Sequence, residues 1–418
     1  MRSRIVAFAL LVACAVGCNA LLGIESADVD DSGGGAGGAS GSAGAAGVGG
    51  GGAGGGAGAG GGAGGPGGGG MGGGAGAGPR CLPPRPATCA PGTLDDAENC
   101  CVAERSCQGG ACTDGECGAV ILAKSTSADP EEVLDVVVVD DQVFWSSGFG
   151  RKLYMTSIDG GPVFTHATSE QGQGFLTRLA ADGTHVYYTN FGSGRVVRVP
   201  LGGGAPETVA ELTALPPEPQ PQAGFGQIAV GGGFAFWAME LTKGVYYAPL
   251  ASLPAQPVLL DGTGTHGVAT DETHVYWGTE AGSIVRRPLS DLAALSEEIV
   301  TGQGIVGDVE VVGDRVYWVG AGGVASAEKD GLNRLLVTLF NERVPLGIAS
   351  DGRDVFITAA GSIDPPVPGA LFRVPLLGGP AVPLAATAAP GDIRAVVVDC
   401  DTLYLANGAD QNVLKLTR

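Results

Sequence analysis

Six polar residues with acidic, basic or hydrogen-bonding side chains recur along the chain at one type of position. Each lies four or five residues before an Asp or Gly of a turn: Asp135, Arg178, Gln227, His266, Asp308 and Arg394. Carboxylates, guanidinium groups and an imidazole that meet at one place can bind a small polar ligand or a cation, and can exchange protons. They are spread over more than half of the chain, so they meet only if these positions are copies of one structural repeat.

A pair of large residues marks that repeat. It follows a short apolar run and a turn in VVVDDQVFW, which ends at Trp145, and in VATDETHVYW, which ends at Trp277. The first members of the seven pairs are spaced 39 to 49 residues apart and are Phe144, Tyr187, Phe236, Tyr276, Tyr317, Phe356 and Tyr404. A period of this length, built from short strands, is typical of β-propeller blades.

The strand pattern predicts an all-β fold with a seven-bladed propeller over residues 119–418. Each copy contains an inner strand, a strand with the aromatic pair, a third strand such as Gly194–Leu201 and a short fourth strand. The last copy ends after its third strand, and Ala119–Ala123 is a spare strand before the first copy. We therefore expect this N-terminal strand to complete the seventh blade and close the ring.

The polar residues fall near the start of the inner strands, where they should surround the mouth of the central channel. The position five residues before each turn holds Asp135, Thr177, Gly226, His266, Asp308, Leu346 and Arg394, and Arg178 and Gln227 lie next to it. The candidates for binding are Asp135, Arg178, Gln227, His266, Asp308 and Arg394; a water-filled polar channel without a ligand is the alternative. No nucleophile elbow, zinc helix or phosphate loop is present, and we expect no catalytic residue, no metal and no cofactor.

The first residues resemble an export signal. Two Arg precede the apolar run Ile5–Val16, which is too short to span a bilayer. Cys14 and Cys18 could each receive a lipid after cleavage, and we favour Cys18, which leaves a more usual apolar length; an ordinary secretory signal is the alternative. The residue after Cys18 is Asn19 rather than Asp, which favours the outer membrane, on its periplasmic or its cell-surface side.

Two further segments separate this signal, residues 1–18, from the propeller. Residues 19–80 are rich in Gly and Ala and should form a disordered tether. Residues 81–118 hold seven cysteines, for which we expect disulfides rather than zinc because no CxxC pair and no His is present. The disulfide candidates are Cys81, Cys89, Cys100, Cys101, Cys107, Cys112, Cys117 and the distant Cys400. A Cys117–Cys400 bond would join the closing strand to its own blade; a free thiol at Cys400 is the alternative.

The charge narrows the choice of partners. The chain has 43 Asp and Glu against 23 Lys and Arg, which gives a formal net charge of −20. Nucleic acid is therefore not an expected partner, because phosphate binding needs clustered basic residues. We expect a monomer that reaches the membrane through its lipid and whose head binds a protein, a small molecule or a glycan.

The repeat resembles that of predicted surface lipoproteins of myxobacteria. Tyr187–Asn190 (YYTN) and Gly194–Gly204 (GRVVRVPLGGG) carry the resemblance most clearly. That family combines a lipidation signal, a Gly-rich tether, a Cys-rich module and a propeller of the YWTD or NHL type. The resemblance implies a propeller at the cell surface and no defined activity.

A second resemblance bears on catalysis. The segment GTHGVATD around His266 is similar to part of the streptogramin-lyase-like propellers, in which a histidine acts as general base. No partner residue for His266 can be assigned from the sequence. Binding or scaffolding at the envelope is therefore the expected function. The alternatives are a propeller-type lyase or lactonase and a structural envelope lipoprotein without a ligand.

Overall fold

The computed structural model describes eleven stretches of the chain: residues 112–113, 116–124, 132–148, 151–169, 174–212, 225–239, 244–320, 323–340, 343–363, 366–399 and 402–417. These residues form strands and turns and no helix, which confirms the predicted all-β class. None of them belongs to a helix of the length and hydropathy that a membrane span requires.

The signal, the tether and most of the Cys-rich segment lie outside the described residues. So do Cys14, Cys18, Cys81, Cys89, Cys100, Cys101, Cys107 and Cys400. Of the Cys-rich segment, the structure gives the two-stranded sheet of β1 (Cys112–Thr113) and β2 (Glu116–Cys117), in which the backbones of Cys112 and Cys117 are partners. The disulfide predictions, including Cys117–Cys400, stay predictions.

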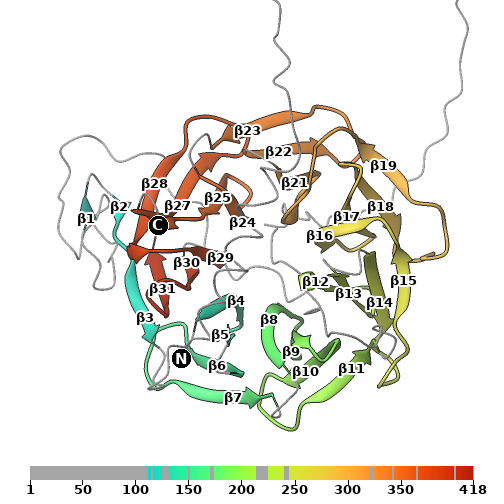
Figure 1. Cartoon of the computed structure of the whole chain (residues 1–418), viewed down its shortest axis with the longest axis horizontal. Coiled ribbons are helices and arrows are strands. Elements are labelled where there is room, and N and C mark those ends of the chain that lie inside the picture. Colours follow the sequence, from blue (N-terminus) through green and yellow to red (C-terminus); the bar gives the residue numbers. More distant parts are fainter. Residues whose placement is uncertain are drawn as a thin grey trace, which may run out of the picture. The chain divides into compact units, whose positions relative to one another are not determined.

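Seven antiparallel sheets form a ring around a central axis, each with its first strand innermost and its fourth strand outermost (Figure 1). The first three blades are β4 (Val133–Val139), β5 (Gln142–Ser147), β6 (Lys152–Ser157) and β7 (Phe164–Thr168); β8 (Gly174–Ala181), β9 (His185–Gly192), β10 (Arg195–Pro200) and β11 (Glu207–Glu211); and β12 (Phe225–Gly231), β13 (Phe234–Met239), β14 (Gly244–Pro249) and β15 (Val258–Asp261). The seven-bladed propeller is therefore confirmed.

The next three blades follow the same order, and only the sixth has an additional strand. They are β16 (Gly264–Thr270), β17 (His274–Thr279), β18 (Ile284–Pro288) and β19 (Glu297–Val300); β20 (Val309–Val312), β21 (Arg315–Gly320), β22 (Gly323–Glu328) and β23 (Leu335–Leu339); and β24 (Pro345–Ser350), β25 (Asp354–Ala359), β26 (Ser362–Ile363), β27 (Pro366–Pro375) and β28 (Val382–Pro390). The additional strand β26 pairs with the start of β27, with Ile363 opposite Pro366.

The seventh blade closes the ring as predicted. It consists of β29 (Ile393–Asp399), β30 (Thr402–Asn407), β31 (Asn412–Thr417) and, as the outermost strand, β3 (Val120–Lys124). The two strands pair antiparallel, with Val120 opposite Lys415 and Lys124 opposite Asn412. Joining both ends of the propeller segment in one sheet holds the ring shut without a covalent bond between the described residues.

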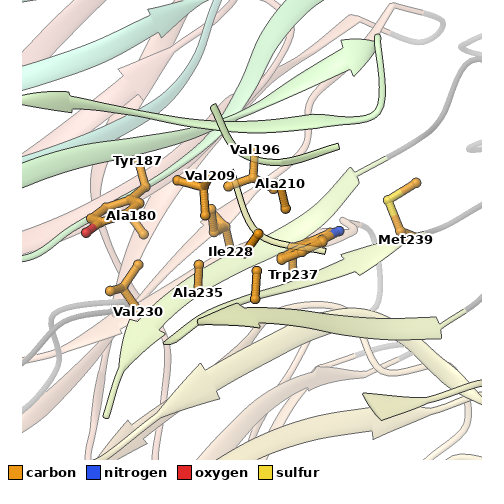
Figure 2. Packing of buried hydrophobic residues seen from close by; sticks show 12 residues of the cluster. Ala180, Tyr187, Val196, Val209, Ala210, Ile228, Val230, Ala235, Trp237 and Met239 are labelled. Carbon is orange, nitrogen blue, oxygen red and sulfur yellow. The ribbon is translucent and has the colours of Figure 1, made fainter. Parts of the chain in front are cut away.

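Seven separate hydrophobic clusters fill the seven contacts between neighbouring blades. In the contact between the second and third blades, Trp237 packs against Val196, Val209 and Ala210 of the preceding blade (Figure 2). In the next contact Phe236, the other member of the same pair, packs against Trp277 of the fourth blade. Each pair thus binds its blade to both neighbours, which explains why these aromatic residues repeat along the sequence.

In six of the seven blades the inner strand begins with a β-bulge. The pairing with the second strand shifts register there, for example between Leu176 and Leu179 and between Phe225 and Ile228. Such bulges change the direction in which the adjacent side chains point. Asp135, Arg178, Gln227, His266 and Arg394 lie at these bulges, whereas Asp308 directly precedes β20, which pairs without a bulge.

Replacing the buried aromatic of one blade contact should strongly destabilise the propeller. Trp237 is 0% exposed, so Trp237→Ala should lower the free energy of unfolding by about 3–5 kcal/mol. Urea denaturation of the purified full chain measures the change. Leu295, which is 93% exposed, provides the matched control, and Leu295→Ala should change stability by less than about 0.5 kcal/mol. Equal effects of the two substitutions would contradict this account of the blade contacts.

Candidate site at the mouth of the central channel

A polar cavity lies where the inner strands begin. Its volume is about 70 Å³, which is room for a few water molecules. Charged or amide side chains from five of the seven blades line it, and they are Asp135, Arg178, Gln227, Asp308, Glu310 and Arg394. The rest of the wall is formed by backbone and by apolar residues of the same inner strands. Convergent polar groups in a concave site on a rigid scaffold are typical of ligand binding.

The structure brings together five of the six candidates from the sequence. Asp135, Arg178, Gln227, Asp308 and Arg394 line the cavity, and His266 is not among its lining residues. The pairing of the strands alone does not explain this difference, because Arg394, like His266, lies two residues before the partner of the second residue of its pair and still lines the cavity. The residue after each of Asp135, Arg178, Gln227 and Asp308 is paired with the second aromatic of its blade, whereas His266 lies two residues before Val268, the partner of Trp277.

Glycine takes the place of a polar side chain in the fourth and sixth blades. Gly267 and Gly347 are the residues equivalent to Asp135. A Cβ at Gly267 would lie 2.3 Å from the carbonyl oxygen of Gly307, so the inner strands of the fourth and fifth blades approach too closely for a side chain there. The ring of polar residues is therefore interrupted by backbone contacts between blades.

Three of the lining side chains accept hydrogen bonds from the inner strand of the next blade. Oδ2 of Asp135 accepts the N–H of Leu179 at 2.9 Å, and Oδ2 of Asp308 accepts the N–H of Ile348 at 2.9 Å. Oε1 of Gln227 accepts one such bond, from Val268 at 3.0 Å, and a second from Val309 of the blade after that at 2.8 Å. These N–H groups face the channel, where no further strand can pair with them. The three side chains thus have a structural function as well as a place in the cavity wall.

The two arginines have different surroundings. The guanidinium of Arg178 interacts through its charge with both Asp135 and Asp308. This interaction acts to lower the pKa of each carboxyl. The guanidinium of Arg394 forms an ion pair with Glu132 of the first blade, and Asp392 lies 3.7 Å away. Arg394 is therefore balanced by two carboxylates at the rim, and Arg178 is the cation that faces the channel carboxylates.

Burial outweighs these favourable contacts for both channel aspartates. It raises the pKa of Asp135 above the usual value and that of Asp308 to about 7, although Arg178 and backbone N–H groups act in the opposite direction. The charge of Asp135 also raises the pKa of Asp308. A carboxyl that titrates near neutral pH can hold a proton, release it to a ligand or exchange it for a cation.

Glu310 lines the cavity but is not among the candidates predicted from the sequence. It lies opposite Tyr317, the first aromatic of the fifth blade. The residues equivalent to it are small and apolar in the other six blades: Val137, Ala180, Ala229, Ala269, Ala349 and Val397. A charged residue within an otherwise Val- and Ala-rich position of the repeat was the signal that could have identified it.

No metal site is found among the described residues, and the repeated aspartates of the turns have a structural role. No group of three or more His, Cys, Asp or Glu in the described stretches could hold a metal ion. Asp182 accepts hydrogen bonds from the N–H groups of Thr184 and His185 and from the hydroxyl of Tyr187. Asp271 has the same contacts in the fourth blade and also an ion pair of 2.7 Å with Lys329 of the fifth. These aspartates stabilise turns and blade contacts outside the cavity.

Comparisons with known proteins identify the fold and no family. No family model matches the sequence, and no curated protein matches it. The structure is similar to that of virginiamycin B lyase from Staphylococcus aureus, with a TM-score of 0.55, 13% identity, and coverage of 72% of this chain and 98% of that chain. It is also similar to the WD40 β-propeller domain of Doa1, with a TM-score of 0.52, 14% identity, and coverage of 72% and 97%. At these identities the similarity extends to the seven-bladed propeller and no further.

The burial of Asp308 should make stability depend on pH. Its pKa is about 7 in the folded protein and 3.8 for the unperturbed group, so the folded state binds the proton more tightly and loses stability as pH rises through this window. Asp308→Asn removes this titration but keeps an acceptor. The difference in unfolding free energy, variant minus wild type, should rise by on the order of 2–3 kcal/mol between about pH 4 and about pH 8.

Urea denaturation at each pH measures these unfolding free energies. Asp182→Asn is the matched control. Burial raises the pKa of Asp182, but hydrogen bonds from Tyr187 and Thr184 outweigh it and leave the pKa below its usual value. The stability that the Asp182 carboxylate provides is therefore present above its unfolded pKa and lost in acid, which is the opposite sign. Parallel pH curves for wild type and Asp308→Asn would contradict the assigned environment of Asp308.

Proposed function

We propose that this chain is a lipid-anchored envelope protein whose propeller head binds a ligand at the mouth of the central channel. Propellers are rigid scaffolds that carry binding sites on many different loops and channel surfaces. The WD40 domain of Doa1 and virginiamycin B lyase share the architecture of the head. Within it, the polar cavity is the part that supports ligand binding.

The observation that carries the proposal is that more charged side chains converge on the cavity than are needed to bond the inner strands to one another. Asp135, Gln227 and Asp308 are needed to satisfy N–H groups of neighbouring inner strands. Arg178 and Glu310 have no such function among the hydrogen bonds of the described residues, and both line the cavity. Charged groups in a cavity wall that cap no inner strand are candidates for binding.

The anchor rests on the sequence alone. A short apolar run after two Arg, followed by Cys18 and a long Gly-rich stretch, is typical of exported lipoproteins with a flexible tether. The same combination carries the resemblance to predicted surface lipoproteins of myxobacteria. Lipid on Cys18 would hold the head near the outer membrane, while the tether would leave its channel face accessible.

A propeller-type lyase or lactonase is the alternative, and one observation favours it. The carboxyl of Asp308 has a pKa of about 7 in a cavity, which suits a general acid or base. The geometry does not give it a second catalytic group of the kind the sequence suggested, since His266 is not part of the cavity wall. An enzyme would convert a bound ligand, and Asp308→Asn would abolish conversion while the ligand still binds.

The lipid anchor has a direct test in a bacterial host that processes lipoproteins. Cells that express the full chain are fed radiolabelled palmitate, with and without globomycin. The wild type and Cys14→Ser should be labelled, Cys18→Ser should not, and globomycin should cause the unprocessed form to accumulate. Labelling that depends on Cys14 would move the anchor to that residue, and processing unaffected by globomycin would show an ordinary secreted protein.

Ligand binding at the cavity should depend on Arg178. Thermal unfolding of the purified full chain is followed in the presence of amino sugars, neutral oligosaccharides, amino acids, alkylamines and dicarboxylates. At least one compound should raise Tm by binding the folded state, and the rise should disappear in Arg178→Met. Arg334→Met, which changes an exposed arginine of the fifth blade, should retain it. If no compound raises Tm, or if the rise persists in Arg178→Met, the cavity is not the binding site and a structural role is favoured.

A further inference from the structure

Glu310 is buried in a way that the propeller itself does not explain. Its side chain is 4% exposed, and its Oε1 has no hydrogen-bond partner among the described residues. The strand β20 on which it lies is apolar apart from this residue, and the equivalent residues of the other inner strands are Val or Ala. An apolar side chain would therefore suit the packing at this position, as it does in the other six blades.

The cost of this arrangement is considerable. A buried polar group without a partner destabilises the fold when neutral, and a buried unpaired charge destabilises it further. Burial, reinforced by the neighbouring carboxyl of Asp308, raises the pKa of Glu310 well above its ordinary value. Arg178 compensates Asp135 and Asp308, and no cationic side chain compensates Glu310. A group from outside the chain can supply the missing partner.

The charges of the cavity wall favour a cation over an anion. Asp135, Asp308 and Glu310 contribute three carboxyl groups, and Arg178 is the cation that faces Asp135 and Asp308. Arg394 is already held by Glu132 and Asp392 at the rim. An entering anion would meet this excess of carboxyl groups, whereas an entering cation would replace the protons that burial keeps on them.

The shape of the site favours an ammonium group over a metal ion. The carboxyl groups do not form a set of three ligands with metal geometry. A fully hydrated divalent ion carries several waters, and the cavity of about 70 Å³ holds only a few. A primary ammonium is compact and presents three N–H donors, which can reach separate carboxyl oxygens. Its alkyl stem would leave through the open mouth between the apolar parts of the inner strands.

We propose that the channel binds the primary ammonium end of a ligand, with Glu310 as its principal partner and Asp308 and Asp135 as further acceptors. This inference rests on the proposed binding function and names the class of ligand for the same site. The ammonium would donate to Oε1 of Glu310, which would gain the partner it lacks. Arg178 would keep Asp135 and Asp308 in place at the mouth while the ligand enters.

The probe for this proposal is n-butylammonium, and the controls are n-butanol, butyrate and calcium chloride at matched ionic strength. Titration calorimetry on the purified full chain should show saturable binding of n-butylammonium at millimolar concentration and none of the controls. Glu310→Gln keeps the size of the side chain but removes its charge, and it should weaken binding at least about tenfold, which corresponds to about 1.4 kcal/mol. Glu328→Gln, on the third strand of the same blade, should bind as the wild type does. Circular dichroism verifies that both variants are folded.

Each other outcome overturns the proposal. Butyrate binding would show an anion site at Arg178, and calcium binding that Glu310→Gln abolishes would show a metal site. Binding of n-butylammonium that is equal in wild type and Glu310→Gln would place the ammonium elsewhere. If n-butylammonium does not bind but another compound raises Tm in an Arg178-dependent manner, the binding function stands and the ammonium inference alone fails.

Discussion

The inner edge of every blade has backbone N–H groups that no strand can pair with, and the rest of the channel follows from this constraint. Unpaired N–H groups away from bulk water are costly, so they need acceptors. Asp135, Gln227 and Asp308 supply them to the blade that follows, and Gln227 also to the blade after that. Glycine replaces the side chain where neighbouring inner strands approach closely, as at Gly267. A polar mouth is thus a requirement of the fold before it is a site.

The channel contains more polar groups than this requirement explains. Arg178 and Glu310 line the same cavity without capping an inner strand. The blade contacts make such an excess possible, because seven aromatic clusters provide the stability of the ring independently of the channel. The closing strand β3 completes the last sheet as its outermost strand. The packing that stabilises the ring therefore lies between the blades, and the proposed site lies at their inner ends.

The repeat in the sequence predicted the number of blades, their strands and the closure by residues 119–123. It succeeded because large aromatic pairs recur for one physical reason, namely packing between neighbouring sheets. The channel was harder to predict, because the turns that follow the inner strands do not correspond residue by residue: by strand pairing Asp182 and Gly231 are equivalent to Val139, one residue before Asp140. Counting back from the turns gave Thr177 and Gly226, whereas the structure places Arg178 and Gln227 at the equivalent positions of Asp135. Glu310 was overlooked because it lies deeper in an apolar strand than the expected ring.

The central claim is that the buried carboxyl of Glu310 binds a cationic ligand. The pKa of this carboxyl, measured with and without the ligand, tests the claim most directly. Carbon-13 NMR of the full chain with labelled glutamate side chains, assigned through Glu310→Gln, reports the titration of this carboxyl. In the free protein its pKa should lie well above the ordinary value for glutamate, and n-butylammonium should lower it. A carboxyl that titrates as an ordinary exposed glutamate, or one whose titration n-butylammonium leaves unchanged, would contradict the claim.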